Sequence, residues 1–255
     1  MFSEEINKVS LSAIKKSELL KKSKMRYLTA TALAGVYVGF GILLIFTIGG
    51  TLSAVHSPAT KIIMGASFGI ALSLVIMAGS ELFTGNNMIM TIGYLEKKVS
   101  LLDSMNIWIY SFIGNFAGSI VLAGLFVGAG LSKGSIAAFI LKTSQVKMAT
   151  PSMELFFRGI LCNMLVCLAV WCAVKLKEET SKLIMIFWCL FAFITTGFEH
   201  SVANMTLLTT ALMIPHGAGI SLGGLTHNLL WVTLGNFVGG AVFIGAAYWF
   251  ISKEK

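Results

Sequence analysis

The stretch Gly79-Ser80-Glu81-Leu82-Phe83-Thr84-Gly85-Asn86-Asn87-Met88 puts polar groups into the middle of a long apolar segment. A second cluster, Thr195-Thr196-Gly197-Phe198-Glu199-His200-Ser201-Val202-Ala203-Asn204, interrupts another apolar segment in the same way. A continuous lipid-facing helix does not carry such groups, because hydrocarbon cannot hydrogen-bond them. A helix that is interrupted inside the protein does carry them. Two interrupted segments in corresponding places are typical of a transport site.

The composition around these clusters predicts a membrane protein. Hydrophobic types make up 56% of the 255 residues and charged types only 12%, whereas about a quarter of a soluble domain is charged. A helix needs about 20 apolar residues to cross a bilayer. Six stretches qualify, at 27–50, 60–94, 104–131, 153–176, 182–212 and 225–252. We therefore predict an all-α membrane domain over 27–252 with six spans, of which the second and fifth are broken.

The lysines and arginines predict the orientation. One side would carry 14 of them: Lys8, Lys15, Lys16, Lys21, Lys22, Lys24, Arg26, Lys97, Lys98, Lys175, Lys177, Lys182, Lys253 and Lys255. The other side would carry 5: Lys61, Lys133, Lys142, Lys147 and Arg158. The positive-inside rule then puts both termini in the cytoplasm of a multi-pass protein of the cell (inner) membrane. The same clustering near span ends explains the net charge of +8 without a nucleic-acid partner.

The sequence contains an internal repeat. Gly114-Asn115-Phe116-Ala117-Gly118 returns as Gly235-Asn236-Phe237-Val238-Gly239, at an offset of 121. Gly79-Ser80-Glu81 with Asn87-Met88 returns as Gly197-Phe198-Glu199 with Asn204-Met205, at offsets of 118 and 117. Halves 27–131 and 153–252 would each hold three spans, so the second half enters the membrane the other way up. Such inverted repeats place the substrate near the midplane, between the halves.

The segment 1–26 is predicted to form a basic amphipathic helix on the cytoplasmic side, with Ile6, Val9 and Ala13 on one face. It would be a solvated tail or an interfacial helix, with a gating role as the alternative. The four cysteines lie in apolar stretches at spacings that fit no usual metal motif. We expect buried thiols, no metal site and no cofactor.

The intramembrane polar residues are the candidate site residues. We expect Glu81, Glu199, Asn87 and Asn204 to support the helix breaks, the carboxylates by accepting backbone N–H bonds. His200 has no counterpart in the first half, and an intramembrane ionisable group is a functional candidate. An enzyme that uses Glu81, Glu199 and His200 as acid–base groups ranks last, because no metal or nucleophile motif accompanies them. Asn163 fits a helix–helix hydrogen bond and a pore-lining donor equally well.

These motifs resemble the signatures of the formate/nitrite transporter family. The resemblance runs from about residue 10 to 252 and includes Gly159-Ile160-Leu161-Cys162-Asn163 and the Gly235-Asn236 stretch. It implies an aquaporin-like protomer in a homopentamer, with one path per subunit for formate, nitrite or hydrosulfide. It also implies two apolar constrictions around a central histidine, which is His200, with polar Thr84 and Asn163 beside it. The constriction positions would be Phe68, Leu72, Leu82, Phe83 and Phe193. Lys147, in the outer loop before span four, would make the approach electropositive.

The sequence departs from the formate branch of the family at Glu81, where that branch tends to have Asp, and at Gly85, where it tends to have Ser. The pattern is more similar to the nitrite and hydrosulfide branches, and hydrosulfide is the predicted substrate. A nitrite or formate transporter with proton coupling is the alternative. A neutral-solute channel is a further alternative, although the paired Asn-Pro-Ala elements that it predicts are missing from the sequence.

Overall fold

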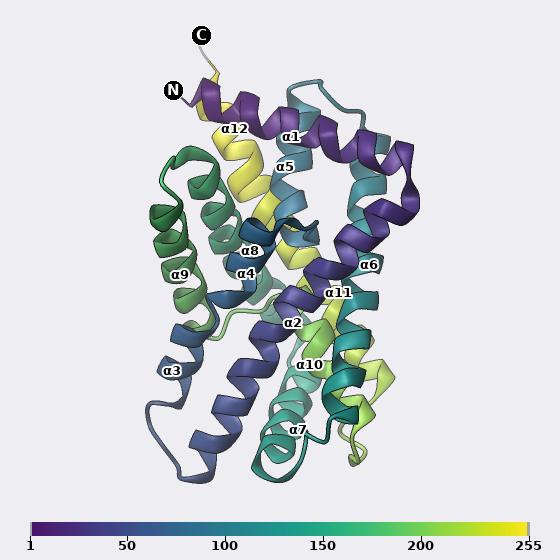
Figure 1. Ribbon diagram of the computed structural model, residues 1–255, viewed down its shortest axis with the longest axis vertical. Helices are drawn as coiled ribbons and strands as arrows, with labels where there is room; N and C mark the ends of the chain where they lie inside the picture. Colours follow the sequence, from purple (N-terminus) through teal and green to yellow (C-terminus); the bar gives the residue numbers. More distant parts are fainter. Residues whose placement is uncertain (1, 254–255) are drawn as a thin grey trace.

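The computed structural model describes residues 2–253, and its elements are helices joined by short connections (Figure 1). In chain order, the helices are α1 Ser3–Lys22, α2 Lys24–Ala54, α3 Thr60–Ser67, α4 Ile70–Leu74, α5 Phe83–Leu95, α6 Leu101–Gly128, α7 Gly134–Ala149, α8 Ser152–Lys175, α9 Glu179–Thr196, α10 Ser201–Met213, α11 Leu222–Val238 and α12 Ala247–Ser252. Short π-helical segments, Val75–Gly79 and Gly239–Ala246, continue α4 and join α11 to α12.

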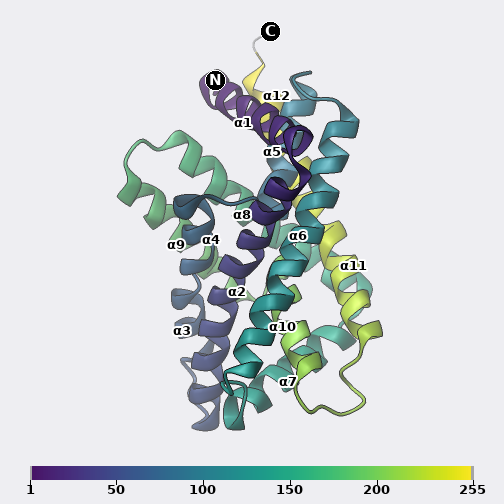
Figure 2. The same cartoon turned by 45° about the vertical axis from the view of Figure 1, so that its right-hand side comes forward.

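Six helical stretches within residues 2–253 are long and apolar enough to cross a membrane, which is the predicted number. They are Lys24–Ala54, Thr60–Gly79, Leu101–Gly128, Ser152–Lys175, Glu179–Thr196 and Leu222–Ser252. The apolar segments 60–94 and 182–212 each hold one of these stretches and then a shorter helix, α5 or α10. The two views place α5 in the half of the molecule near both termini and α10 in the opposite half (Figures 1 and 2).

Both copies of the Gly-Asn-Phe stretch place glycines at close helix crossings. A Cβ on Gly118 of α6 would overlap the backbone carbonyl of Ala32 in α2, and a Cβ on Gly239 would overlap that of Ile160 in α8. Small residues four apart let membrane helices approach this closely. The first copy of the stretch therefore packs α6 against α2, and the second copy packs the end of α11 against α8.

Helix α1 lies across the end of the bundle that carries both termini (Figure 1). Ile6, Val9 and Ala13 are buried on one of its faces, and its main contacts are with α5 and α2. This docking excludes the solvated tail, because a solvated helix would leave these three side chains exposed. Helix α7 lies at the opposite end of the molecule (Figure 2).

Candidate permeation path

Two glycines start the breaks in the second and fifth spans. Gly79 has a φ of 80° and Gly197 a φ of 83°, a left-handed conformation that costs glycine little. Beyond each glycine the chain is extended, at Leu82 before α5 and at His200 before α10. The freed backbone groups then need partners inside the protein.

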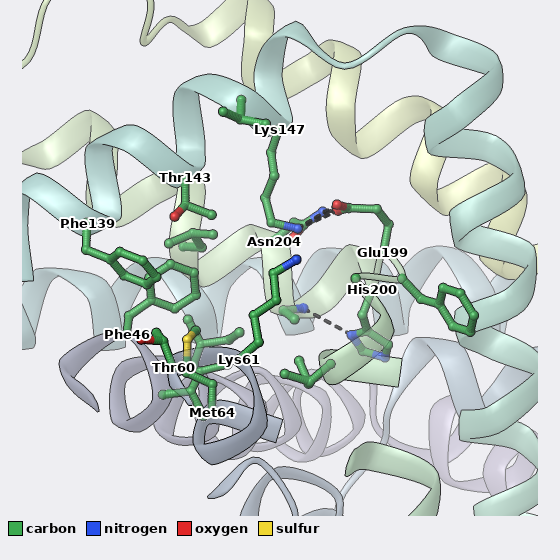
Figure 3. A pocket seen from close by; sticks show the side chains of 18 of the residues that line it. Phe46, Thr60, Lys61, Met64, Phe139, Thr143, Lys147, Glu199, His200 and Asn204 are labelled. Carbon is green, nitrogen blue, oxygen red and sulfur yellow. Dashed lines mark hydrogen bonds and ion pairs between the residues drawn. The ribbon is translucent and has the colours of Figure 1, made fainter. Parts of the chain in front are cut away.

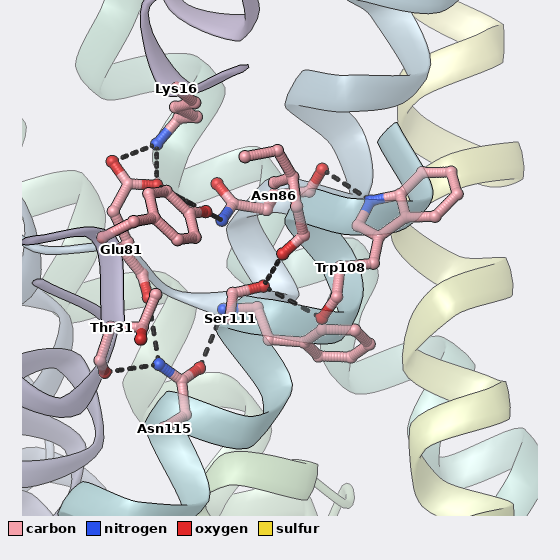
Figure 4. Close-up of polar contacts among 10 residues, drawn as sticks. Lys16, Thr31, Glu81, Asn86, Trp108, Ser111 and Asn115 are labelled. Atoms are coloured by element: carbon pink, nitrogen blue, oxygen red, sulfur yellow. Dashed lines mark hydrogen bonds and ion pairs between the residues drawn. The ribbon is translucent and has the colours of Figure 1, made fainter. Parts of the chain in front are cut away.

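Asn115, from the first copy of the Gly-Asn-Phe stretch, supplies those partners at the first break (Figure 4). Its Oδ1 accepts a hydrogen bond from the Phe83 N–H at 2.9 Å. Its Nδ2 donates to the backbone carbonyls of Glu81 at 2.9 Å and Thr31 at 2.7 Å. Asn115 is fully buried, so one side chain ties the break to α2 and α6.

Asn236 makes the same three kinds of bond at the second break. Its Oδ1 accepts from the Ser201 N–H at 2.8 Å. Its Nδ2 donates to the carbonyls of Glu199 at 2.9 Å and Gly159 at 2.8 Å. The internal repeat pointed to this asparagine, but the sequence did not reveal its role.

The prediction that Glu81 accepts backbone N–H bonds is wrong. Within residues 2–253 its carboxylate accepts from side chains: Lys16 Nζ at 2.6 and 2.8 Å, the Tyr27 hydroxyl at 3.3 Å and Asn86 Nδ2 at 3.3 Å. Figure 4 shows Lys16 approaching the carboxylate from above. The lysine comes from α1, so the N-terminal helix neutralises a carboxylate at the first break.

The same prediction for Glu199 is wrong for the same reason. Its carboxylate accepts from Lys147 Nζ at 2.7 Å and from Asn204 Nδ2 at 2.7 Å (Figure 3). Lys147 lies in the last turn of α7 rather than in a loop. Because its charge is compensated by Glu199, Lys147 cannot alone make the approach electropositive, which corrects the expectation taken from the resemblance.

Asn87 was also assigned incorrectly. Asn86 contacts Glu81 five residues earlier, as Asn204 contacts Glu199 five residues earlier. The side chain of Asn87 is buried, with no hydrogen-bond partner among residues 2–253. The break-supporting asparagines are therefore Asn86 and Asn204, at a constant offset of 118.

His200 lies at the N-terminus of α10, where its ring joins the two broken spans. Its Nδ1 accepts a hydrogen bond from the Ala203 N–H at 3.1 Å, so in the neutral ring the proton is on Nε2. Nε2 lies 3.0 Å from Thr84 Oγ1 in α5 and donates to it. The hydroxyl hydrogen of Thr84 is then left to be donated elsewhere. This contact brings together two residues that the resemblance placed at the centre of the path.

Asn163 makes helix–helix hydrogen bonds and is not a pore-lining donor. Its Nδ2 donates to the carbonyls of Thr84 at 3.2 Å and Asn236 at 2.6 Å. An amide nitrogen carries two hydrogens, and both are used. Asn163 thus holds Thr84 in place, which settles the two alternatives that the sequence left open.

Three cavities lie in sequence along the molecule, linked by shared lining residues. The cavity at the α7 end of the molecule, which we name the outer cavity, has a volume of about 690 Å³ and is lined by residues of α2, α3, α7 and α10, with Glu199 and His200 among them (Figure 3). The cavity at the α1 end, which we name the inner cavity, has a volume of about 360 Å³ and is lined by Lys16 and Glu81 among others. A central cavity of about 10 Å³ shares Phe193 and His200 with the outer one, and Leu72 and Leu82 with the inner one.

Aromatic and aliphatic side chains narrow the path on both sides of the central cavity. Phe68 and Phe193 meet edge to face, with ring centroids 5.5 Å apart, and Phe193 stacks on the His200 ring at 6.0 Å. Leu72 and Leu82 separate the central and inner cavities. Phe83 packs edge-on against Phe112 at 5.5 Å and is absent from the described residues that line the three cavities. Its role at a constriction stays a prediction.

The whole chain matches known membrane transport proteins. The family model described as Formate/nitrite transporter covers residues 3–250. The chain belongs to the formate/nitrite transporter family. Nitrite transporter NirC of Escherichia coli (strain K12) is 44% identical over 255 residues, which cover 100% of this chain and 94% of that protein.

Two solved structures share the fold of this chain. One, described as an FNT family ion channel, has a TM-score of 0.94 and 41% identity, covering 99% of this chain and 100% of the other. The second, a pentameric formate channel with formate bound, has a TM-score of 0.81 and 28% identity, covering 91% and 98%. The chain is thus a multi-pass membrane protein of a family of transporters and channels, not of enzymes.

Proposed function

We propose that this protein is a channel for small monovalent anions, with nitrite as the first substrate to test. The observation that carries the proposal is the line of three cavities, which narrows to apolar residues on both sides of His200. Nitrite is favoured over the predicted hydrosulfide because a nitrite transporter is 44% identical over the full chain. Hydrosulfide and formate stay as predictions.

The proposed mechanism balances dehydration against hydrogen bonding. An anion that enters the apolar narrowing loses water, and a charge at the bilayer centre costs about 3 kcal/mol. The Nε2–H of His200, or the hydroxyl of Thr84 that it contacts, would replace part of that hydration. If His200 first took up a proton from the outer cavity to become imidazolium and then gave one proton to the anion, the neutral ring would be restored and a neutral acid would cross the second narrowing. That step would couple transport to protons.

We further infer that the two halves form an inverted repeat and that both termini are cytoplasmic. Asn115 and Asn236 make matching bonds, and each carboxylate pairs with a lysine of an end-capping helix, Lys16 of α1 or Lys147 of α7. The lysine and arginine count supports the orientation. A homopentamer is proposed because the formate channel of similar fold is pentameric.

Anion influx into proteoliposomes tests the proposal. Nitrite, formate and hydrosulfide are compared at several pH values for the wild type, for His200→Asn, and for His216→Asn as a control at an exposed loop histidine. We expect flux in the wild type and the control, and a loss or altered pH dependence only in His200→Asn. Unchanged flux and pH dependence in His200→Asn would refute its central role. Osmotic swelling in glycerol without anion flux would instead indicate a neutral-solute channel.

A further inference from the structure

The outer cavity carries more positive than negative charge. Four cationic side chains line it, Lys61, Lys142, Lys147 and Arg158, and Glu199 is the carboxylate among its lining residues. The charged groups that line the inner cavity, among the described residues, are Lys16 and Glu81, which form an ion pair. The two mouths therefore differ in charge although their scaffolds match.

Two of the four outer cations are already compensated. Lys147 pairs with Glu199 at 2.7 Å and Arg158 with Glu154 at 2.7 Å. Lys61 and Lys142 form no ion pair with any carboxylate of residues 2–253. The uncompensated charge of the outer cavity thus resides on these two lysines.

Lys61 is positioned to deliver an anion to the narrowing. It lies at the start of α3, and Phe68 directly follows the end of the same helix. Residues seven apart share a helix face, about 10 Å apart along the axis. Met64, which lies between them on that face, also lines the outer cavity. Figure 3 shows Lys61 and Lys147 extending into this cavity from opposite sides.

We propose that Lys61 and Lys142 form the anion-collecting site of the outer mouth, which raises the local concentration of hydrated monovalent anions before they reach Phe68. This inference rests on the proposed function. A cleft lined by one sign of charge between low-dielectric walls focuses its field and speeds the arrival of opposite charge. Lys147, neutralised by Glu199, would instead hold the second break in shape.

The test is the initial uptake of nitrite and of formate by cells that express each variant in a host without its own carriers for these anions. The variants are Lys61→Gln, Lys142→Gln, the double glutamine variant and the double arginine variant. Lys133→Gln is the matched control, because Lys133 lies just before α7 and outside the residues that line the outer cavity. Ionic strength is varied with potassium gluconate, since the Debye length falls from about 30 Å at 0.01 M to about 3 Å at 1 M.

At low ionic strength we expect the double glutamine variant to lower uptake at subsaturating anion by roughly threefold or more. The maximal rate should stay unchanged, the double arginine variant and Lys133→Gln should behave as the wild type, and the difference should vanish at high salt. Equal losses in Lys133→Gln, or a loss that salt does not remove, would overturn the inference. Absence of uptake in the wild type would instead overturn the proposed function itself.

Discussion

Replacing Asn115 by Leu should destabilise the protein strongly, because the shape is nearly kept while every polar atom of the side chain is lost. The Phe83 N–H and the carbonyls of Thr31 and Glu81 would each lose a partner in a fully buried site. An interhelical hydrogen bond in a membrane protein is worth about 0.6 kcal/mol on average and about 1.7 at most, so three lost bonds give about 2 to 5 kcal/mol. Asn236→Leu should cost about the same, since its three bonds match.

The free energy of unfolding can be measured by titrating purified protein with SDS in mixed micelles and following tryptophan fluorescence. Asn87→Leu is the matched control, because Asn87 is as buried as Asn115 but has no hydrogen-bond partner within residues 2–253. We expect Asn87→Leu to leave stability unchanged or to raise it, since an unpaired buried polar group costs about 1 to 3 kcal/mol. If Asn87→Leu destabilised the protein as much as Asn115→Leu, the hydrogen-bond argument would be refuted.

Two further predictions concern packing and charge. Gly118→Ala should push α6 away from the Ala32 carbonyl and cost about 1 to 3 kcal/mol in the same SDS titration, whereas Gly124→Ala on the same helix meets no atom of the described residues within 4 Å and should be neutral. Lys147→Gln should lower stability by about 3 kcal/mol and reduce anion flux, because it leaves the Glu199 carboxylate, 5% exposed, without its cation. The double variant Lys147→Gln/Glu199→Gln should recover most of the stability; no recovery would argue that the pair is not coupled.

The sequence predicted features that depend on local composition. Six apolar stretches gave the number of spans, and the polar clusters within the second and fifth marked where helices end. Hydrocarbon excludes polar groups wherever they occur, so this signal needs no knowledge of tertiary contacts. His200 stood out for the same reason, as an ionisable group in an apolar segment.

The partners of these polar groups were not predictable, because they lie on distant elements. Lys16 is 65 positions from Glu81, and Lys147 is 52 positions from Glu199. A capping glutamate and an ion-paired glutamate look the same in a sequence. The error at Asn87 arose differently: Asn86 and Asn87 are adjacent and identical, and only the geometry of the break decides which of them faces Glu81.

The offset of 118 residues that relates the two breaks also relates residues that line the central cavity. Its lining includes Leu72 with Leu190, and Leu82 with His200, two pairs at that same offset. Both members of the first pair are leucines, so in the proposed inverted repeat equivalent positions supply apolar lining to the same cavity. At the second pair, leucine in the first copy corresponds to histidine in the second. The backbone hydrogen bonds around both breaks match. The imidazole of His200 is therefore the group that makes the central cavity differ from a symmetric, wholly apolar constriction.

A symmetric, wholly apolar constriction would block the passage of any anion, since it offers no hydrogen bond to replace the lost water. Carboxylates at both mouths would add repulsion, but Lys16 and Lys147 cancel their charges. The outer mouth then retains the charge of Lys61 and Lys142, and the centre retains the donor of His200 held by Thr84. These two departures from symmetry act at different stages of permeation. The lysines act on the arrival of the anion at the outer cavity, and His200 acts where the anion loses its water. Removing the first should therefore change the concentration dependence of flux, and removing the second its maximal rate.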